Sequence, residues 1–296
     1  MTCADDHSLT ASVIIAVHNR HEFLDEALDS VRAQTLAPAE IIIVDDGSTR
    51  AETIAYLDQL QEAGAATVHR IKNRGLAGAR NEGRRLATGS ALLFLDDDDV
   101  ILPQYLELAV GRLAADPGTD VVYCNAEFFG AFDGPWELPP YDPHSIVLDN
   151  MVFSSAVIRA SRFDAVGGYD ATFRRGREDH ELWIRMTAQG AGFHRLEPTL
   201  FRYRQTDTSM QKSIGTTHAA MAETYAEIVR RNPEIYLDNI ELLWEEIFSL
   251  RGEVKRLRGR YGRLDDLLRT GRQAQRTLMH RIEVARDRSR GKRGDR

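Results

Sequence analysis

The stretch ALLFLDDDDV, residues 91–100, decides the predicted fold. Its first five residues are uncharged and form a short run without alternation, which is typical of a strand buried on both faces of a parallel sheet. The four aspartates that follow then lie at the carboxyl end of this strand, where open α/β sheets bind ligands. The stretch therefore predicts a central strand that ends in an acidic ligand site.

The four aspartates also predict a metal site. Adjacent carboxylates repel one another, and the apolar strand limits how far they can move into water. A bound cation would neutralise them, so we interpret Asp96, Asp97 and Asp98 as an Asp-x-Asp motif. The alternative is a solvated acidic turn, or a helix cap formed by Asp98 and Asp99.

Predicted strands and helices alternate through the first hundred residues. Short apolar runs predict strands, and apolar residues at helical spacing predict the helices between them. The strands cover residues 12–17, 40–44, 67–71 and the stretch quoted above, and the helices cover 22–34, 52–63 and the segment that follows 73–78. A helix at 103–115 and strands at 121–129 and 151–159 come next. This pattern predicts a doubly wound α/β domain with right-handed crossovers.

The length and composition narrow the class of protein. The 296 residues suffice for one large domain, or for one domain with an appendage. No apolar run approaches the ~20 residues that a membrane helix needs, and the acidic start MTCADDHSLT is unlike a signal peptide. Cys3 and Cys124 have neither zinc-ligand nor redox-pair spacing, so we expect free thiols and a cytoplasmic protein.

Charge is unevenly distributed along the chain. Residues 251–296 contain 16 Lys and Arg against 6 Asp and Glu, a net charge of +10, which leaves −17 for residues 1–250. The split suggests an acidic body with a basic arm, and a solvated helix surface is the alternative. Because Tyr261 is the only aromatic residue among the basic ones, we expect no nucleic-acid partner.

Polar residues also follow the second predicted strand. Asp45 and Asp46 lie at its carboxyl end, and Gly47 allows a tight turn. Ser48 or Thr49 could cap the next helix. The alternative role of the two aspartates is turn and cap chemistry alone.

The helix that opens at residues 73–78 carries Arg80, Asn81, Arg84 and Arg85. Backbone amides and arginines at the start of a helix could bind an anion. The glycine spacing fits neither a P-loop nor a dinucleotide fingerprint.

A second pair of carboxylates, Glu178 and Asp179, begins a helix whose apolar face is Leu182, Trp183 and Met186. The helix dipole is expected to lower carboxylate pKa values there. An ionised carboxylate suits a general base, and a pair of capping carboxylates is the alternative.

Residues 130–149 are rich in Pro, Gly, Asp and aromatics, which predicts a long ordered loop of the sort that forms a binding-site wall. Trp136 and Tyr141 could stack on a ligand ring, although packing beneath the loop is favoured.

Taken together, these segments resemble the family-two inverting glycosyltransferases with the GT-A fold, over residues 12–210. Five segments match in the family's order: SVIIAVHNR, IIIVDDGST, NRGLAGARNEG, FLDDDD and GGYDATFRRGRED. The resemblance implies a doubly wound mixed sheet and an enzyme that uses a nucleotide-diphosphate sugar, most simply a UDP-sugar.

The resemblance also assigns roles to residues. Asp46 would hold the uracil or ribose with support from Asp45, and the opening loop and third segment would contact the nucleotide through Val17, His18, Asn19, Arg20, Asn73, Gly78, Arg80 and Asn81. Asp96, Asp97 and Asp98 would form the donor and metal site, with Asp98 in direct contact with Mn2+ or Mg2+. Asp179 would be the general base, with Glu178 and Arg177 nearby.

Two segments depart from the family pattern. The opening loop reads Ala16-Val17-His18-Asn19, where the family often has Pro-Thr-Tyr-Asn. Stacking of a tyrosine on the base is therefore missing, so either His18 substitutes or the loop lies differently. The segment YRQTDTSM lacks the histidine that many members use as a metal ligand, and Thr206 or Asp207 lies near that place.

The pattern after about His218 predicts a continuous helix. Apolar residues alternate spacings of four and three as in a heptad seam, which comprises Tyr236, Ile240, Leu243, Ile247, Leu250, Val254, Leu257, Tyr261, Leu264 and Leu268 and, after an interruption at Gly271 and Gln275, resumes at Leu278, Ile282 and Ala285. Such a narrow stripe favours a coiled coil that forms a homodimer or binds another coiled-coil protein. The alternative is a helix folded back on its own domain.

The predicted domains are a GT-A catalytic domain at 1–217, a helical coiled-coil extension at 218–290 and a basic tail at 291–296. We expect the tail to be disordered and to contact anionic lipid at the inner membrane face.

These features predict a metal-dependent inverting glycosyltransferase that transfers a sugar to an acceptor hydroxyl in glycan, glycolipid, glycopeptide or natural-product biosynthesis. One alternative is a sugar-nucleotide pyrophosphorylase, although HNRHEF is a poor version of the phosphate loop that such an enzyme needs after its first strand. The other is a non-catalytic scaffold with a vestigial transferase domain, against which the intact Asp96, Asp98 and Asp179 argue.

Overall fold

The computed structural model describes residues 9–173, 176–206 and 218–262. The chain divides into two compact units, Met1–Asn239 and Ile240–Arg296. The boundary between these units lies after Asn239, whereas the sequence pattern predicts a change after residue 217. Each unit is described by itself.

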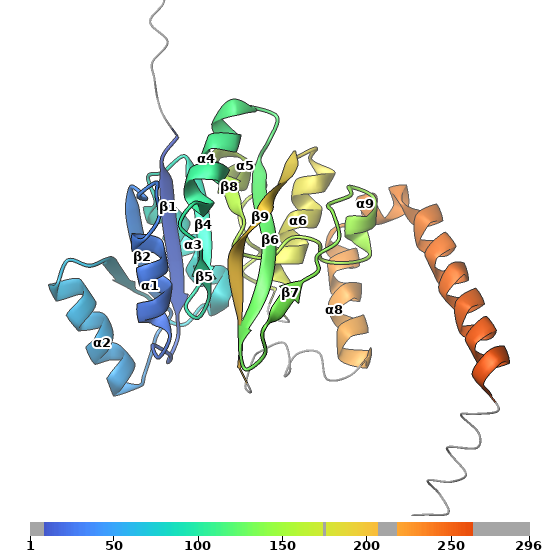
Figure 1. Ribbon diagram of the computed structural model, residues 1–296, viewed down its shortest axis with the longest axis horizontal. Coiled ribbons are helices and arrows are strands. Elements are labelled where there is room, and N and C mark those ends of the chain that lie inside the picture. The colour runs from blue at the N-terminus through green and yellow to red at the C-terminus, as the bar shows by residue number, and fades with distance from the viewer. Residues whose placement is uncertain (1–8, 174–175, 207–217, 263–296) are drawn as a thin grey trace, which may run out of the picture. The chain divides into compact units, whose positions relative to one another are not determined.

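Four parallel strands form one half of the sheet in the first unit (Figure 1). β1 (Ala11–Val17) lies between β2 (Glu40–Asp45) and β4 (Ala91–Asp96), and β3 (Thr67–Arg70) extends the sheet beyond β2. β1, β2 and β4 are largely buried, as expected for strands covered on both faces. The four strands predicted within the first hundred residues are confirmed.

Helices connect these strands as predicted. They are α1 (Leu24–Arg32), α2 (Ala51–Glu62) and α3 (Gly75–Leu86). Helix α3 lies very close to β1, because a Cβ atom at Gly83 would stand 2.3 Å from Cγ2 of Ile14. Glycine at this position therefore sets the depth at which α3, and the arginine it carries toward the ligand site, packs on the sheet.

The other half of the sheet is mixed. β8 (Val157–Arg159) runs antiparallel between β4 and β6 (Val121–Gly130). β9 (Phe193–Gln205) runs parallel to β6, and β5 (Val100–Ile101) and β7 (Gly134–Trp136) pair antiparallel with β9 and β6. Within the described residues the order is β3-β2-β1-β4-β8-β6-β9-β5, with β7 added at β6. The mixed α/β sheet agrees with the expected fold class.

Two strand expectations were wrong. The strand expected at 151–159 is confined to its last three residues, and residues 152–154 line a cavity instead. The long β9 was not expected at all. Glu197 and Pro198 interrupt its pattern, and its pairing with β6 shifts register on both sides of Asn125, as strands do at a β-bulge.

The expected helix caps were also wrong. Helix α2 takes no side-chain cap from Ser48 or Thr49. Asn19 supplies the acceptor instead, since its Oδ1 receives the amides of Thr49 at 2.6 Å and Arg50 at 2.9 Å. Helix α4 (Tyr105–Ala115) begins after Gln104 without a side-chain cap, so neither Asp98 nor Asp99 caps it.

The segment between β7 and α6 (Glu178–Ala188) contains a short 3-10 helix at Ser145–Val147 and α5 (Ala160–Ala165). Trp183 of α6 donates to the carbonyl of Val152 at 2.8 Å, which fixes the helix against the segment before β8. Tyr141 stacks on Phe193 with ring centroids 4.1 Å apart. Tyr141 therefore has the packing role that the sequence favoured.

The helix expected to run unbroken from residue 218 is interrupted twice. α8 (His218–Arg231) ends before Asn232, and α9 (Pro233–Asp238) ends before Asn239. Both belong to the first unit, and Tyr236 is buried there with 6% of its surface exposed. Tyr236 therefore does not contribute to an exposed seam.

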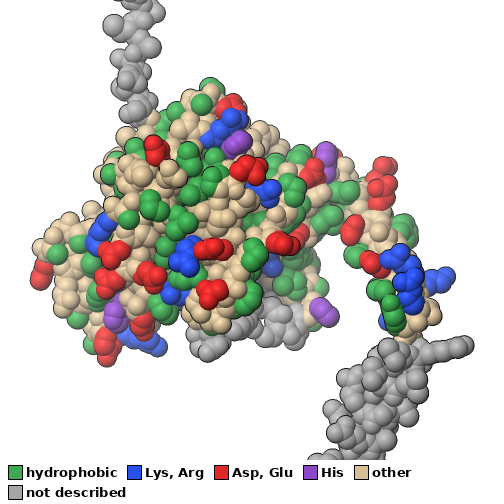
Figure 2. Space-filling view, viewed as in Figure 1, with side chains coloured by type: hydrophobic (Ala, Val, Ile, Leu, Met, Phe, Trp, Pro, Cys, Tyr) green, Lys and Arg blue, Asp and Glu red, His purple; other side chains and the backbone are tan. Residues whose placement is uncertain are grey.

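The second unit contains a helix over the described residues 240–262. Its large apolar side chains are exposed, and Figure 2 shows hydrophobic side chains beside acidic and basic ones on its surface. The exposed set comprises Ile240, Trp244, Ile247, Phe248, Leu250, Val254, Leu257 and Tyr261. The expected seam from Leu264 to Ala285 and the basic tail lie outside the described residues.

Across the described ranges, no helix combines the length and apolar character needed to cross a bilayer. Cys124 is a buried free thiol, and burial raises its pKa to about 12. Cys3 lies outside the described residues.

Candidate active site

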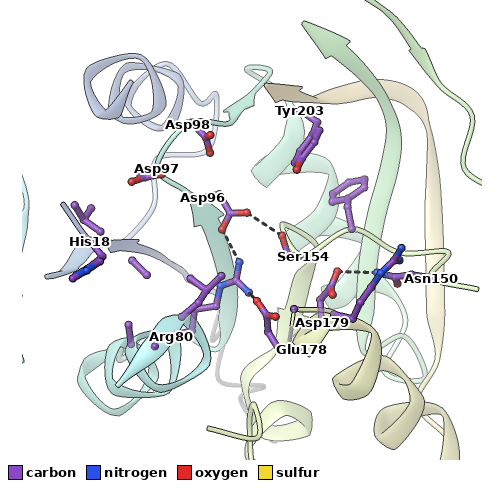
Figure 3. Close-up of a pocket in the computed structure, with 18 of the residues that line it drawn as sticks. His18, Arg80, Asp96, Asp97, Asp98, Asn150, Ser154, Glu178, Asp179 and Tyr203 are labelled. Carbon is purple, nitrogen blue, oxygen red and sulfur yellow. Dashed lines mark hydrogen bonds and ion pairs between the residues drawn. The ribbon is translucent and has the colours of Figure 1, made fainter. Parts of the chain in front are cut away.

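A cavity of about 810 Å³ opens at the carboxyl ends of β1 and β4 (Figure 3). It brings together most of the residues that the sequence singled out from five separate segments. Those that line it are Val17, His18, Arg20, Asp46, Asn73, Arg80, Asp96, Asp97, Asp98, Glu178 and Asp179. The carboxylates at strand and helix ends therefore share one site.

Four other expected residues do not line the cavity. Asn81 donates to the carbonyl of Tyr169 at 2.7 Å and accepts its amide at 2.9 Å. Gly78 lies within α3, where a Cβ atom would meet the Cβ of Arg74 at 2.6 Å. Asn19 accepts the amides of Thr49 and Arg50 just before α2, and Asp45 accepts the amide of Ser48 at 2.8 Å. In the structure, three of these residues bond to backbone groups and Gly78 allows close packing within α3.

Arg84 and Arg85 were expected to face an anion together with Arg80. Arg84 instead forms a forked pair with Asp164, with its Nη2 2.6 Å from the carboxylate. Arg85 pairs with Glu82 on the same helix at 2.8 Å. Only Arg80 among these three residues lines the cavity.

Asp46 fixes the helix start at one end of the cavity. Its two carboxylate oxygens accept the amides of Arg74 at 2.6 Å and Gly75 at 2.8 Å. His18 lies against it, with Nδ1 2.9 Å from the Asp46 carbonyl oxygen. Asn73 approaches the same ring at 3.4 Å. A carboxylate at a helix start also complements the helix dipole, so part of the Asp46 role is structural.

Arg20 neutralises the acidic stretch from the loop after β1. Its guanidinium forms an ion pair with Asp97, and its Nη1 lies 2.8 Å from Oδ2 of Asp98. Burial raises the pKa of Asp97 to about 7 against the opposing effect of Arg20. Burial likewise raises the pKa of Asp98. An arginine thus occupies the position where the sequence predicts a cation.

Arg80 joins the two carboxylate groups of the site. Its Nη2 lies 2.6 Å from Oδ1 of Asp96, and its Nη1 lies 3.3 Å from Oε1 of Glu178. The side chain is 2% exposed. Burial opposes the charged form, but Asp96, Tyr169 and Glu178 outweigh it and raise the pKa of Arg80. Arg80 is therefore a permanent buried cation between two acids.

Glu178 and Asp179 begin α6 after Arg177, whose backbone is left-handed with φ 67°. Asn150 donates to Oδ2 of Asp179 at 2.8 Å. The expectation of lowered pKa values was wrong for Glu178. Burial raises its pKa, and the attraction of Arg80 does not reverse this effect.

Aromatic side chains form the wall that faces these carboxylates. Trp136, Phe153, Phe201 and Tyr203 line the cavity from β7, the segment before β8, and β9. Burial raises the pKa of Tyr203, and four nearby aspartates, Asp99, Asp96, Asp98 and Asp179, add to the rise. Its hydroxyl therefore stays protonated beside both carboxylate groups.

The sequence was compared with known protein families. Residues 12–180, more than half of the chain, match the model of glycosyl transferase family 2.

The chain belongs to glycosyl transferase family 2.

Relatives in the family are similar over part of their length. The putative glycosyltransferase EpsE of Bacillus subtilis is 28% identical over 213 residues, which are 68% of this chain and 75% of EpsE. The putative glycosyltransferase EpsH of the same organism is 39% identical over 119 residues, which are 40% of this chain and 34% of EpsH. This chain spans 61% of an uncharacterized Haemophilus influenzae glycosyltransferase that is 27% identical. It therefore covers between a third and three quarters of the length of these relatives.

Solved structures show the same fold. S. aureus TarS 1-349 in complex with UDP-GlcNAc superposes with a TM-score of 0.60 at 18% identity, covering 78% of this chain and 72% of that one. GalNAc-T7 with UDP, GalNAc and Mn2+ superposes with a TM-score of 0.61 at 20% identity, covering 76% and 48%. The mixed sheet of this family 2 chain is thus the GT-A fold.

The family 2 resemblance implies a divalent cation, and the carboxylates of the acidic stretch fit a cation that takes few protein ligands. In the described part of the chain, no group of three or more His, Cys, Asp or Glu side chains is arranged to hold an ion. Asp96 and Asp98 each meet an arginine through one oxygen. This donor set fits a hard cation that takes one or two carboxylates and completes its shell with phosphate oxygens. Asp207, considered as a further ligand, lies outside the described residues.

Ser154 and Tyr203 are among the cavity residues of the family 2 site that the sequence did not single out. Ser154 donates to Oδ2 of Asp96 at 3.5 Å, and its segment had been assigned to a strand. Tyr203 lies on the unexpected β9. The alternation of aromatic and charged residues over 201–204 was the signal for β9. Ser154 had no such signal because its partner is 58 positions away.

Proposed function

We propose that this protein transfers a sugar, with inversion, from a nucleotide-diphosphate sugar to an acceptor hydroxyl. One observation carries the proposal: the aspartates at the end of β4 and the Glu178–Asp179 pair line the same cavity and are joined through Arg80. UDP and UDP-GlcNAc in the structures of similar fold support a UDP-sugar as the donor.

The nucleotide would lie where His18, Asp46 and Asn73 meet. These residues come from the ends of β1 and β2 and the start of α3, and they surround one end of the cavity. The amides of Arg74 and Gly75 are already bound to Asp46. Recognition of the base or ribose would therefore use His18, Asn73 and the remaining acceptor capacity of Asp46.

Asp98, together with Asp96, would hold Mn2+ or Mg2+ and the donor's diphosphate. The ion would offset the negative charge that develops on the departing diphosphate. Arg20 lies on the same carboxylates. Its guanidinium could turn from Asp98 to a phosphate oxygen when the site fills, because arginine binds phosphate as readily as carboxylate.

Asp179 would act as the general base. The hydrogen bond from Asn150 to Oδ2 orients the carboxylate, which leaves Oδ1 to take the proton of the acceptor hydroxyl. The acceptor oxygen would then bond to the anomeric carbon while the bond from that carbon to the diphosphate breaks. Attack opposite the leaving group inverts the configuration.

We further propose that residues 240–262 mediate self-association. Eight large apolar side chains of this helix are exposed, and Ile240, Ile247, Leu250, Val254, Leu257 and Tyr261 follow the heptad spacing of a coiled-coil seam. A second copy of the helix offers the same stripe. For the basic tail, which lies outside the described residues, we propose contact with anionic lipid.

The proposed activity is tested with a panel of UDP-, GDP- and dTDP-sugars in the presence of Mn2+. Calorimetry would measure binding, and NMR would follow hydrolysis and the anomer first released. We expect manganese-assisted binding of at least one UDP-sugar and release of the inverted anomer. A pyrophosphorylase would instead need pyrophosphate to consume the sugar nucleotide, and a vestigial scaffold would bind or turn over none of the panel.

A further inference from the structure

The cavity has two chemically different sides. His18, Asp46 and Asn73 lie near β1, β2 and α3, on one side of the central strand β4. The aromatic wall, which is Trp136, Phe153, Phe201 and Tyr203, lies on the β6, β7 and β9 side. Whatever binds against the aromatic wall is therefore separated from the nucleotide-binding end by the acidic stretch.

Strand pairing explains why the rings face the cavity together. Trp136 on β7 and Phe201 on β9 are both paired with Ala126 of β6. Residues paired across neighbouring strands point to the same face of a sheet. Tyr203 lies two residues beyond Phe201 and therefore shares that face. The small side chain of Ala126 leaves room between the large rings, so their position follows from the register.

The rings support one another from behind. Trp136 stacks on Phe128 with centroids 5.2 Å apart and planes inclined by 21°, and it also contacts Tyr203 at 5.1 Å. Phe153 stacks on Phe201 at 4.3 Å. Phe153 and Phe201 are buried, whereas Trp136 and Tyr203 keep partly exposed surfaces. Two supported rings with open surface in a cavity make a rigid platform.

The platform adjoins the candidate base. Phe153 follows Asn150, the residue that donates to Asp179, by three positions, and Figure 3 shows Tyr203, Asn150 and Asp179 on the side of the cavity away from His18. A group that lies on the rings would therefore present its edge to Asp179. The face of a pyranose ring is lined with C–H groups and packs on aromatic rings, while its hydroxyls project from the edge.

We propose that the aromatic wall binds a sugar ring of the acceptor, so that the acceptor is a carbohydrate whose ring stacks on Trp136 and Tyr203. This inference rests on the proposed function and assigns the acceptor class to that same site. It excludes an acceptor that meets this wall through a peptide backbone or an unbranched lipid chain alone, because neither presents the flat face of a ring to the two aromatic side chains.

The test uses the full-length protein with Mn2+ and the UDP-sugar that it hydrolyses fastest. Methyl glycosides of glucose, galactose, mannose and N-acetylglucosamine are compared with glycerol, a serine peptide and a polyprenyl phosphate as acceptors. The variants are Trp136→Ala, Trp136→Phe and Phe132→Ala. Phe132 is the matched control, because it contacts Phe128 at 5.8 Å but is 57% exposed and outside the cavity wall.

We expect wild-type protein to glycosylate at least one methyl glycoside. Trp136→Ala should lower the ratio of transfer to hydrolysis about tenfold through a higher acceptor KM, which corresponds to ~1.4 kcal/mol. Trp136→Phe should retain part of the ratio, and Phe132→Ala should match wild type. Thermal unfolding and UDP affinity are measured on each variant to separate acceptor binding from misfolding.

Three outcomes would overturn the inference. In one, wild-type protein uses only the non-carbohydrate acceptors. In another, Trp136→Ala keeps the wild-type ratio. In the third, the variant loses affinity for UDP in proportion to transfer, which would place the donor on the rings. A wild-type protein that neither binds nor hydrolyses any sugar nucleotide would refute the proposed function itself, and the acceptor class would fall with it.

Discussion

Asp96 and Glu178 are bound to the two terminal nitrogens of one buried guanidinium, that of Arg80. The two acids are 82 positions apart and belong to different motifs, one at the end of β4 and one at the start of α6. The arginine therefore fixes the spacing between the end of β4 and the start of α6. Any substitution at Arg80 acts on both at once.

Replacing Arg80 by methionine should lower the free energy of unfolding by about 3–5 kcal/mol, because it leaves two partly buried carboxylates without their cation. Urea denaturation of the variant measures the loss. Arg85→Met is the control, since Arg85 pairs with Glu82 on the exposed side of the same helix and its loss should leave the midpoint unchanged. Equal midpoints for Arg80→Met and wild type would contradict the structural role.

Asp179→Asn should reduce kcat about 10²–10⁴-fold, because asparagine cannot accept the acceptor proton. UDP affinity should change little, since Asp179 lies on the side of the cavity away from His18. Steady-state transfer assays and calorimetry measure the two quantities. Asp133→Asn, at an exposed loop position, controls for loss of charge. Near-normal turnover in Asp179→Asn would remove this residue from the mechanism.

Arg20→Gln should increase the affinity for Mn2+ in the absence of nucleotide about fivefold, because the guanidinium competes with the ion for Asp97 and Asp98. Electron paramagnetic resonance of free Mn2+ measures this directly. Arg50→Gln, whose partner Glu22 lies outside the acidic stretch, should behave as wild type. Weaker Mn2+ binding in Arg20→Gln would show that the arginine organises the site rather than occupying it.

The stability of the metal-free protein should depend on Asp97. Burial raises the pKa of Asp97 from 3.8 to about 7, so the folded state holds this proton more tightly than the unfolded state. The contribution of this proton to the free energy of unfolding is fully present below pH ~4 and is lost as the pH rises to 7. Asp97→Asn carries no titrating proton at this position. The Tm of the variant minus the Tm of wild type should therefore be larger at pH 8 than at pH 5. A difference in Tm that is independent of pH would contradict this titration.

Val254→Asp combined with Leu257→Asp should convert a dimer into a monomer, because charges in a coiled-coil seam are buried without partners. Sedimentation equilibrium gives the mass. Lys255→Asp with Arg256→Asp places the same charges on the flank of the helix and should leave the dimer intact. An identical mass for the seam variant and wild type would exclude self-association through residues 254 and 257.

The sequence predicted well those parts of the fold that depend on local pattern. The strands β1, β2 and β4 are buried on both faces. Each can therefore be recognised from its own apolar run, without knowing which strands lie beside it. The strand β9 was not predicted because Pro198 breaks its pattern. A register shift at Asn125 of β6 accommodates this break. The prediction of a continuous helix after His218 was wrong for a similar reason. Asn232 and Asn239 interrupt the helix, although the spacing of apolar residues continues past them.

For the site, the sequence predicted the acids but not their partners. Carboxylates at the ends of parallel strands must meet at one edge of the sheet, which is why Asp46 and Asp98 line one cavity. Which cation meets which acid is decided by contacts such as Arg20 with Asp97, 77 positions apart. Asn19 and Asn81, which the resemblance places at the nucleotide, bond to backbone groups in the structure. No local pattern separates a polar side chain that binds a ligand from one that satisfies backbone amides.

Asn81 binds both the amide and the carbonyl of Tyr169, as a neighbouring strand would. These two hydrogen bonds join α3, which carries Arg80 into the cavity, to the segment that precedes α6. Because the atoms of Tyr169 in these bonds belong to the backbone, the requirement falls on the side chain at position 81 alone. A chimaera of two relatives should therefore tolerate exchange of residue 169 but lose stability when position 81 cannot both donate and accept.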